Sequence, residues 1–354
     1  MHHPLPILAI ACCAAALAQQ SPVSNASVQT LPVTGGLEAA IQSALSRGPA
    51  PMWIGYAVPA IPGENNSCCW SNGGSWGCGL DGQRATGTPA RAANTPVKLE
   101  GPGYFAVLLR AENGAVTKVR GYSIDCPLDA GGLPFLWFTG VRPAESVAML
   151  LKRGSAVDSA ATGKKSGSDS HLHAIAMHQA PEADSALESL ATAAGSAEEI
   201  RKKALFWLAN SRGRRGYQVV ARAAREDASE KVREHAIFAL TQSKEPEAIP
   251  AIIRIAKEDK SPRVRGQALF WMSQQASRDA AEAITESIEN DPETEVKKKA
   301  VFALSQLPGG EGVPKLIDVA RRNTNPAVRK QAMFWLGQSK DPRALQFLEE
   351  VLTR

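Results

Sequence analysis

The sequence lacks the features that mark a membrane-spanning protein, a nucleic-acid-binding protein or a histidine-rich metalloenzyme. Beyond the first 18 residues, no apolar run approaches the roughly 20 residues that a membrane helix needs. The net charge is only +5 over 354 residues, and there are 6 histidines in all. Neither a phosphate-binding glycine loop nor a paired cysteine–histidine nucleophile is recognisable. The sequence therefore predicts no integral membrane segment, no catalytic residue, no metal and no cofactor.

The first 18 residues have the character of an export signal. The segment from Pro4 to Leu17 is apolar, and Ala16-Leu17-Ala18 is a small-x-small cleavage site. The basic residues that usually precede such a segment are absent, since only His2 and His3 stand there. Lipid attachment at Cys12 is an alternative to cleavage after Ala18. We predict a signal peptide at 1–18 and a bacterial protein that is periplasmic or secreted.

The cysteines indicate disulfides. Four of the 6 lie beyond the signal: Cys68, Cys69, Cys78 and Cys126. An even number in an exported protein predicts two bonds. Neighbours such as Cys68 and Cys69 rarely bond to each other, because the peptide plane between them strains the ring. One is therefore expected to pair with Cys78 and the other with Cys126. A zinc site and a redox sensor stay open as alternatives, although the two Cys-x-x-Cys pairs of a zinc knuckle are absent.

The chain up to residue 170 is typical of a small α+β domain between two flexible segments. Residues 19–36 and 155–170 are rich in small and polar residues, and we predict a flexible lead and a linker there. Within 37–154 we predict a helix at 37–46, strands at 52–58, 104–111, 115–124 and 135–139, and a helix at 141–153. Asn113-Gly114 favours a tight hairpin turn between the two middle strands. The Gly- and Ser-rich loop at 59–96 carries three of the four cysteines and needs covalent fastening.

A short segment returns at a constant interval in the second half of the chain. Its phenylalanines are spaced by 32 residues each time: Phe206, Phe238, Phe270, Phe302 and Phe334. Two helical stretches fit within each period. One such unit is too small to bury its own apolar face, so the units must stack into a solenoid. We predict an all-α solenoid at 171–354, with a degenerate cap at 171–195 and repeats at 196–228, 229–260, 261–292, 293–324 and 325–354.

Two positions of the first helix in each repeat predict how the units stack. Small side chains that allow neighbouring helices to approach recur at Ala204, Ala236, Ala268, Ala300 and Ala332. Large and small residues alternate at Trp207, Ala239, Trp271, Ala303 and Trp335. A large residue beside a small one lets helices interdigitate, so we interpret these tryptophans as core packing. A ligand platform would need their rings exposed.

A polar pattern also follows the period. The turns between repeats carry Asp227, Asp259, Asp291 and Asn323, and six residues later come Arg233, Arg265, Lys297 and Arg329. An acid at a helix start accepts backbone N–H groups, and an arginine can bridge neighbouring turns. Repetition in every unit predicts a structural ladder and not an active site.

Together these features resemble HEAT repeats. The paired helices, the Pro-x-Val-Arg sequences at 262–265 and 326–329 and the polar ladder are similar to the short bacterial type named after phycobilisome lyases. The resemblance covers 171–354 and implies an interaction scaffold. It extends to two enzyme-linked groups, the bilin lyases, which act inside cells on a pigment protein, and the deoxyhypusine hydroxylases, whose di-iron site needs several His-Glu pairs. This chain has no His-Glu dipeptide and only His235 in its full repeats, so the hydroxylase ligands are missing. The domain before residue 171 resembles no known family.

For such a scaffold we predict a protein partner bound along the concave face by the second helix of each repeat. The charged side chains concerned form two lanes, Arg222, Arg254, Glu286, Asp318 and Glu350, and Arg225, Lys257, Glu289 and Arg321. The first lane is basic at one end and acidic at the other, which suits a partner of complementary polarity. A solvated face without a partner is the alternative.

Residues 196–354 carry 28 Lys and Arg against 22 Asp and Glu. Acidic residues interrupt the basic ones, whereas phosphate binding favours a continuous basic stripe. We therefore expect no nucleic acid, and a monomeric protein.

An enzyme or enzyme accessory, lyase-like or a hydrolase, is the second function that the sequence allows. Its chemistry would lie in the N-terminal domain near Trp53, Tyr56 and Trp76, with Asp81 or Asp125 as the titratable acid. The solenoid would then serve as a docking arm.

The histidines at His171, His173 and His178 could begin a metal site. Residues two apart on a helix diverge by about 200°, so His171 and His173 would not converge on one ion. We interpret this segment as a solvated cap helix.

Overall fold

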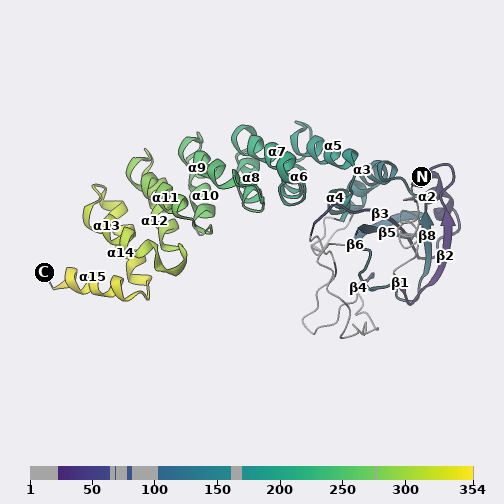
Figure 1. Ribbon diagram of the computed structural model, residues 1–354, viewed down its shortest axis with the longest axis horizontal. Coiled ribbons are helices and arrows are strands. Elements are labelled where there is room, and N and C mark those ends of the chain that lie inside the picture. The colour runs from purple at the N-terminus through teal and green to yellow at the C-terminus, as the bar shows by residue number, and fades with distance from the viewer. Residues whose placement is uncertain are drawn as a thin grey trace, which may run out of the picture. The chain divides into compact units, whose positions relative to one another are not determined.

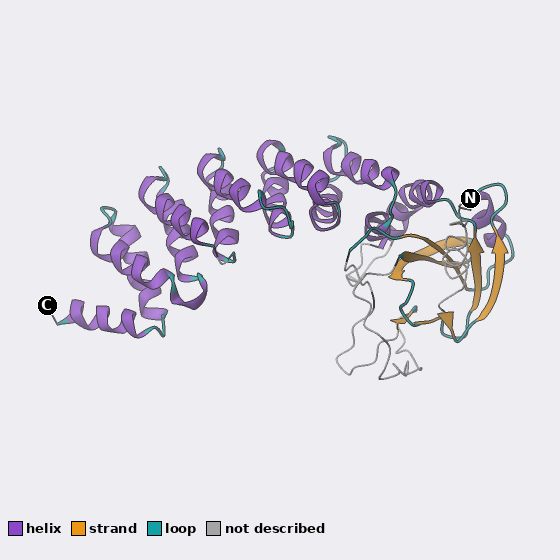
Figure 2. Ribbon diagram, viewed as in Figure 1, coloured by secondary structure: helices purple, strands orange, loops and turns teal. Residues whose placement is uncertain are grey.

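The computed structural model describes residues 23–63, 68, 78–81, 103–160, 170–275 and 277–353. The predicted signal peptide lies outside these residues. The chain forms two compact units, Met1–Ser189 and Leu190–Arg354, which are considered separately. All the described strands belong to the first unit, and the second consists of helices (Figure 2). The expected architecture, an α+β domain followed by an all-α solenoid, is confirmed.

The first unit is built on a five-stranded mixed sheet (Figure 1). Its strands, in spatial order, are β2 (Ser27–Pro32), β8 (Pro134–Thr139), β3 (Met52–Pro59), β5 (Tyr104–Glu112) and β6 (Ala115–Ser123). β8 pairs in parallel with β2 and β3, whereas β5 is antiparallel to both of its neighbours, β3 and β6. A smaller parallel sheet has the order β1 (Val23–Ser24), β7 (Leu128–Asp129) and β4 (Cys78–Gly79).

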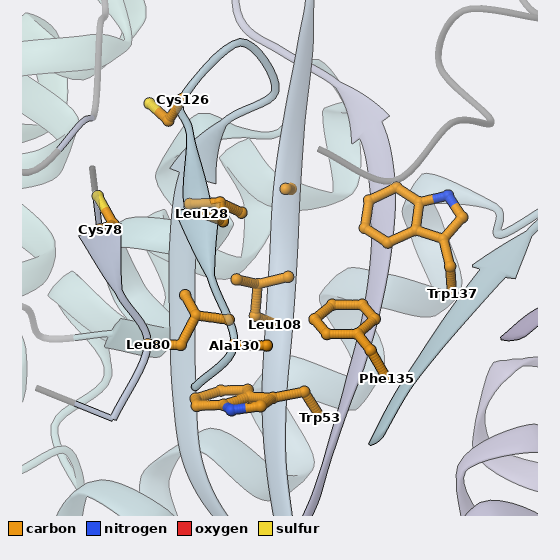
Figure 3. Close-up of a cluster of buried hydrophobic side chains, with 10 residues drawn as sticks. Trp53, Cys78, Leu80, Leu108, Cys126, Leu128, Ala130, Phe135 and Trp137 are labelled. Atoms are coloured by element: carbon orange, nitrogen blue, oxygen red, sulfur yellow. The ribbon is translucent and has the colours of Figure 1, made fainter. Parts of the chain in front are cut away.

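The central strand β3 is covered on both faces. Trp53 and Tyr56 on this strand are fully buried, and so is Ile54 between them. One face packs against the segments that carry the small sheet, where Trp53, Leu108 and Phe135 meet Leu80 and Leu128 (Figure 3). Burial on both faces explains why this strand alternates only weakly in sequence.

The hairpin between β5 and β6 is confirmed. Glu112 pairs with Ala115, and the turn residues Asn113 and Gly114 have φ angles of 53° and 72°. Both angles lie in the left-handed region, which asparagine and glycine tolerate better than other residues.

The predicted flexible lead at 19–36 is wrong for residues 27–32. These residues form β2, which pairs along its whole length with β8, from Ser27 with Pro134 to Pro32 with Thr139. The prediction failed because the partner strand lies more than a hundred residues away in the sequence. Most side chains of β2 are exposed, so its sequence shows little apolar alternation.

Three helices complete this unit: α2 (Leu37–Leu45), α3 (Pro143–Ala160) and α4 (Ser170–Met177). α3 extends seven residues beyond the predicted end at 153, into the segment predicted as a linker. Helices α2 and α3 are joined by Glu38, which accepts hydrogen bonds from Arg153 and Lys152. The bond from Arg153 is the main cause that lowers the pKa of Glu38 to about 2.

The interpretation of 171–195 as a solenoid cap is corrected for its first helix. The segment is divided near Pro181 as expected, into α4 and α5 (Pro181–Thr192). α4, however, contacts α3 and β6, and the division between the two units falls after Ser189. The apolar face of α4 includes Leu172 and Ile175, which are fully buried. The same helix is not a solvated one, since His171 and His178 are also buried.

Acid should destabilise the first unit through His173. Its ring packs edge-on against Phe105 at 5.4 Å, and burial lowers its pKa to about 4. As the pH falls below about 6.5, the unfolded chain binds the proton before the folded one does, so stability decreases between about pH 6.5 and pH 4. We expect a loss of up to about 2 kcal/mol at pH 5. Urea unfolding and hydrogen exchange of the amides in β5 and β6 should both show this loss of stability. The substitution His173→Gln should remove most of the pH dependence. An equal loss in the variant would contradict the assignment.

The second unit stacks pairs of helices with the predicted period. The first helices of the repeats are α6 (Glu198–Ser211), α8 (Glu230–Thr241), α10 (Pro262–Ser273), α12 (Thr294–Ser305) and α14 (Pro326–Gln338). The second helices are α7 (Gly213–Glu226), α9 (Ala248–Glu258), α11 (Arg278–Asn290), α13 (Gly312–Arg322) and α15 (Pro342–Leu352), and a 3₁₀ turn at Pro308–Gly310 precedes α13. Ser229, Ser261 and Asn325 cap first helices by accepting a backbone N–H bond, which satisfies an otherwise unpaired donor.

This second unit is curved, and its first helices lie on the inner side. Figure 1 shows α8, α10, α12 and α14 along the inside of the curve and α9, α11 and α13 along the outside. The alanine position of the first helices is fully buried in all five repeats. Small side chains there let successive first helices approach closely, and the row with the shorter spacing must lie inside a curve.

The expectation that the second helices line the concave face is therefore wrong.

In the part of the chain that the structure describes, no helix is both long and apolar enough to cross a membrane.

Candidate interaction surface

The polar ladder connects the first helix of a repeat with the turn before it and the turn after it, through backbone hydrogen bonds and buried ion pairs. Arg233 Nε and Nη2 donate to the carboxylate of Asp259 at 2.9 and 3.2 Å, while Nη1 donates to the backbone oxygen of Asp227 at 2.8 Å. Arg265 repeats the arrangement with Asp291, at 2.7 and 2.9 Å. These carboxylates also accept the backbone N–H two residues further on, at 2.8–2.9 Å. Each ion pair thus fixes the first helix of a repeat to the turn that leads into the next repeat.

The ladder changes character in the last repeats. Lys297 donates to the backbone oxygen of Glu289, and the turn after it carries Asn323 in place of an aspartate. Arg329 donates to the backbone oxygens of Asn323 and Thr324. Asn323 removes the negative charge of this rung, while Lys297 keeps its positive charge but is partly exposed, so no fully buried ion is left unpaired. The ladder contains no open position at which a substrate could bind between its partners.

The charged lanes of the second helices lie away from the inner side. All nine predicted residues are exposed or partly exposed: Arg222, Arg254, Glu286, Asp318 and Glu350, and Arg225, Lys257, Glu289 and Arg321. Several of them neutralise one another between neighbouring helices, as Lys257 with Glu286 and Arg321 with Glu350, both at 2.6 Å. The nine carry a net charge of only +1. These two pairs involve four of the nine residues.

The inner side carries a row of aromatic rings that touch across the repeats. We define the aromatic stripe as Phe206, Phe238, Phe270, Phe302 and Phe334 with Trp207, Trp271 and Trp335. Ring contacts connect them without a break, with centroid distances between 4.9 and 6.3 Å. Each ring is partly exposed except Phe334, which is 54% exposed.

The interpretation of the tryptophans as core packing holds only in part. Trp271 reaches from α10 to Phe238 of α8 at 4.9 Å, while Ala239 beside that phenylalanine is fully buried. A large residue beside a small one does allow neighbouring first helices to interdigitate, as predicted. The indole rings nevertheless remain partly exposed to solvent.

Two polar rows flank the aromatic stripe on the same helices. Residues three and four positions before each phenylalanine share its face, one turn earlier. They include the five lysines that we call the basic row: Lys202, Lys203, Lys298, Lys299 and Lys330. Four positions after the phenylalanines lies the glutamine row: Gln242, Gln274, Gln306 and Gln338, all of them exposed.

Local contacts hold both rows in place. A Cβ on Gly266 would lie 2.3 Å from Cδ of Lys299, so the lysine stem crosses α10 at this glycine. In the glutamine row, the side-chain amide of Gln274 donates to the hydroxyl of Ser273 at 3.2 Å, and Gln306 does the same to Ser305 at 3.0 Å.

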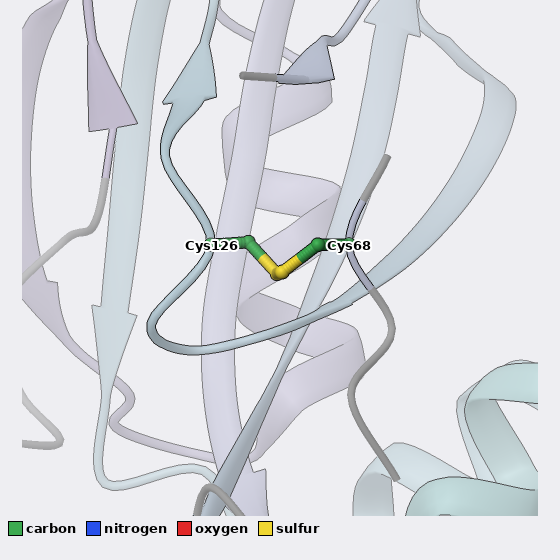
Figure 4. The surroundings of a disulfide bond; sticks show 2 residues. All are labelled: Cys68 and Cys126. Carbon is green, nitrogen blue, oxygen red and sulfur yellow. A yellow bond between two sulfur atoms is a disulfide. The ribbon is translucent and has the colours of Figure 1, made fainter. Parts of the chain in front are cut away.

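The first unit contains disulfide bonds, as the cysteines of the sequence predict. Cys68 and Cys126 form a disulfide (Figure 4). Cys78 is disulfide-bonded as well, while Cys69 lies outside the described residues. Cys68, Asp125 and Cys126 are close enough together to resemble a metal site, but both sulfurs are already bonded to each other.

Among the described residues of the first unit, a buried series of hydrogen bonds most resembles a catalytic arrangement. His178 Nδ1 lies 2.6 Å from the backbone oxygen of Ala174, so this nitrogen carries the proton and Nε2 accepts from Ser146 Oγ at 2.8 Å. Ser146 in turn accepts from the Tyr56 hydroxyl at 2.7 Å. Burial raises the pKa of Tyr56. Tyr56, Ser146 and His178 are each 0% exposed, so the series joins β3, α3 and the end of α4 without access for a substrate.

The other residues proposed for an enzyme do not meet. Trp53 is fully buried, and Trp76 lies outside the described residues. Asp81 is held by Arg110 at 3.0 Å and Lys118 at 3.1 Å, whereas Asp125 is exposed. The expectation that the sequence contains no Gly-x-Ser-x-Gly elbow is wrong for the spacing alone, since Gly73-Gly74-Ser75-Trp76-Gly77 fits it. That motif acts only between a strand and a helix, and these residues lie outside the described part of the chain.

Comparison with known families agrees with the helical stack of the second unit. A family model of HEAT repeats matches residues 183–273, 217–305 and 281–354. Residues 183–354 are HEAT repeats. The match begins within α5, in keeping with the assignment of α4 to the first unit. The N-terminal residues match no family model, and no curated protein matches the chain.

Three of the solved structures that match the chain are the following. The Escherichia coli protein YibA is 21% identical over 54% of this chain and 70% of its own, with a TM-score of 0.34. Human deoxyhypusine hydroxylase is 16% identical over 59% and 92%, with a TM-score of 0.23. The CpcE–CpcF complex of phycocyanin lyase from Nostoc sp. PCC7120 is 18% identical over 56% and 76%, with a TM-score of 0.30. Likenesses this distant carry no function to this chain.

Proposed function

We propose that the protein is an exported, non-enzymatic scaffold whose HEAT solenoid binds a partner protein. The observation that carries this proposal is the repetition of one surface pattern, an aromatic ring followed one turn later by an amide side chain, on all five first helices. Lysines precede the ring on three of these helices, α6, α12 and α14. A reaction needs one constellation of groups, whereas a pattern repeated along a stack suits an elongated partner. The hydrogen-bonded groups of the first unit, by contrast, are occupied by one another.

Export is supported by the apolar segment Pro4–Leu17 and by the Cys68–Cys126 disulfide. Disulfides persist mainly in oxidising compartments such as the periplasm or the extracellular medium. In this proposal the first unit is a covalently fastened module, and the protein itself is a monomer before it meets its partner.

Affinity capture from the native envelope fraction, with the whole mature chain as bait, tests the function. We expect one protein to co-purify in a fixed ratio and to give a complex of defined mass by light scattering. The variant Arg222→Glu with Arg254→Glu should capture it equally well, because these residues lie on the outer row. Absence of any stoichiometric partner, together with turnover of a small molecule by the purified chain, would favour the enzyme instead.

A further inference from the structure

We propose that the inner face of the solenoid binds an extended, acidic segment of the partner, with apolar side chains on the aromatic stripe and carboxylates on the basic row. This inference rests on the proposed scaffold function and adds the binding face and the chemistry of the partner. Each of its parts comes from a different observation on the first helices.

The charge of the inner face indicates which charge the bound segment of the partner carries. At the ten positions three and four residues before the phenylalanines, the chain has five lysines against one acid, Glu234, a net charge of +4. Lys299 and Lys330 are exposed, and neither forms an ion pair with any residue that the structure describes. The outer lanes carry only +1 and pair among themselves. Lys202 and Lys298 pair with Glu199 and Glu295 on their own helices at 2.8 and 3.0 Å. The positive charge available to a ligand is therefore that of Lys299 and Lys330. Their unpaired positive charge beside open apolar surface favours a ligand that brings carboxylates to it.

The stack determines the shape of the partner. Helices in contact lie about 8–10 Å apart, so five first helices span roughly 35 Å between the outer two. An extended peptide advances about 3.3 Å per residue, and about 12 residues would run from one end of the stripe to the other.

A cavity beside the stripe provides an anchoring point. A volume of about 150 Å³ is lined by Leu304, Leu316 and Trp335, with Gln306 and Gln338 of the glutamine row among its polar groups. The indole Nε1 of Trp335 is buried and has no hydrogen-bond partner in the described part of the chain. A buried donor without an acceptor is unfavourable, and a carbonyl oxygen of a bound peptide would satisfy it. The space suits one aliphatic side chain of the peptide.

The glutamine row supplies groups for a peptide backbone. A carboxamide has two hydrogens and one acceptor oxygen, and each of Gln242, Gln274 and Gln306 uses one hydrogen on the hydroxyl next to it. That bond fixes the amide plane, and the remaining hydrogen and oxygen match the alternating C=O and N–H groups of an extended chain. Exposed glutamines therefore stand on the opposite side of the stripe from the lysines.

Single-stranded nucleic acid fits this face less well. Bases bind by stacking on open ring faces. The phenylalanine rings of this stripe already stack on one another, with interplanar angles of 10° for Phe206–Phe238 and 1° for Phe270–Phe302. Glu199, Glu234 and Glu295 also interrupt the basic side chains along the first helices.

The test is fluorescence anisotropy with the whole mature chain and synthetic labelled peptides. The first peptide, of about 12 residues, alternates Leu with Glu and Ser in an extended sequence, and the second has Lys in place of each Glu. The inner variant is Lys299→Glu with Lys330→Glu, and the matched outer control is Arg222→Glu with Arg254→Glu. Both reverse two exposed charges, and equal urea midpoints confirm that both are folded.

We expect the acidic peptide to bind and the basic one not to bind. The inner variant should weaken binding by about tenfold or more, the outer control by less than about twofold, and added salt should weaken binding to the unmodified chain. Equal binding of both peptides, or equal loss in both variants, would overturn the inference. Tighter binding of an oligothymidylate through the same lysines would replace the peptide with nucleic acid.

Failure of this inference and failure of the scaffold function give different results. If the native partner is captured but neither peptide binds, the acidic segment is wrong and the scaffold stands. If the outer control alone loses the peptide, the inner face is wrong. If neither a partner nor a peptide binds, both proposals are overturned.

Discussion

Replacement of Arg233 by leucine should lower the free energy of unfolding of the solenoid by about 3 kcal/mol or more, because it leaves a buried carboxylate without its cation. The side chain of Arg233 is 1% exposed and that of its partner Asp259 is 3% exposed. The substitution also removes the donor to the backbone oxygen of Asp227. Urea unfolding followed by circular dichroism measures the loss, since the second unit contributes most of the helix.

Arg329→Leu is the matched control for this prediction. Arg329 occupies the same position of the ladder three repeats later, and it donates to backbone oxygens, with no carboxylate partner in the described residues. It should cost about 1 kcal/mol. The double variant Arg233→Leu with Asp259→Leu should recover part of the loss, because it removes both buried charges. Equal costs for Arg233→Leu and Arg329→Leu would show that the ion pairs do not hold the repeats together.

Removal of the Cys68–Cys126 disulfide should destabilise the first unit by about 4 kcal/mol, as chain entropy predicts for a closed loop of this length. The two cysteines are 58 residues apart in the sequence and bring the long loop to the end of β6. The effect should be confined to this unit, because the second unit has no cysteine.

Hydrogen exchange of Cys68→Ala with Cys126→Ala resolves the two units. Amides of β3 and β5 should exchange faster, while those of α8, α10 and α12 should keep their protection. Loss of protection in both units to the same extent would mean that the disulfide stabilises the solenoid as well.

The repeat was predictable from the sequence because each unit is specified by its own residues. Alanine, valine and phenylalanine positions recur every 32 residues, so the same helical pattern is present in several repeats. The first unit lacks this redundancy. Strand β2 is stabilised by β8, more than a hundred residues later, and nothing within Ser27–Pro32 alone indicates that partner. Helix α4 likewise packs against β6 and α3, although its sequence is compatible with a place at the start of the solenoid.

The inner side of the curve could have been predicted from the sequence, but the general expectation about second helices took precedence. The signal was the alanine lane from Ala204 to Ala332, since small residues mark the row of closest approach and hence the inner side of the curve. The ring exposure of Trp207, Trp271 and Trp335, in contrast, depends on side-chain orientation, which a periodic pattern does not specify.

Site-specific photo-crosslinking in the native envelope tests partner binding by the inner face most directly. The photoreactive residue p-benzoylphenylalanine would replace Phe238, Phe270 or Phe334 on the inner row, and Lys257 or Arg254 on the outer row. The proposed arrangement predicts that all three inner positions crosslink to an acidic segment of the same polypeptide, while the outer positions do not. Crosslinks from the outer row alone, or none from either row, would contradict it.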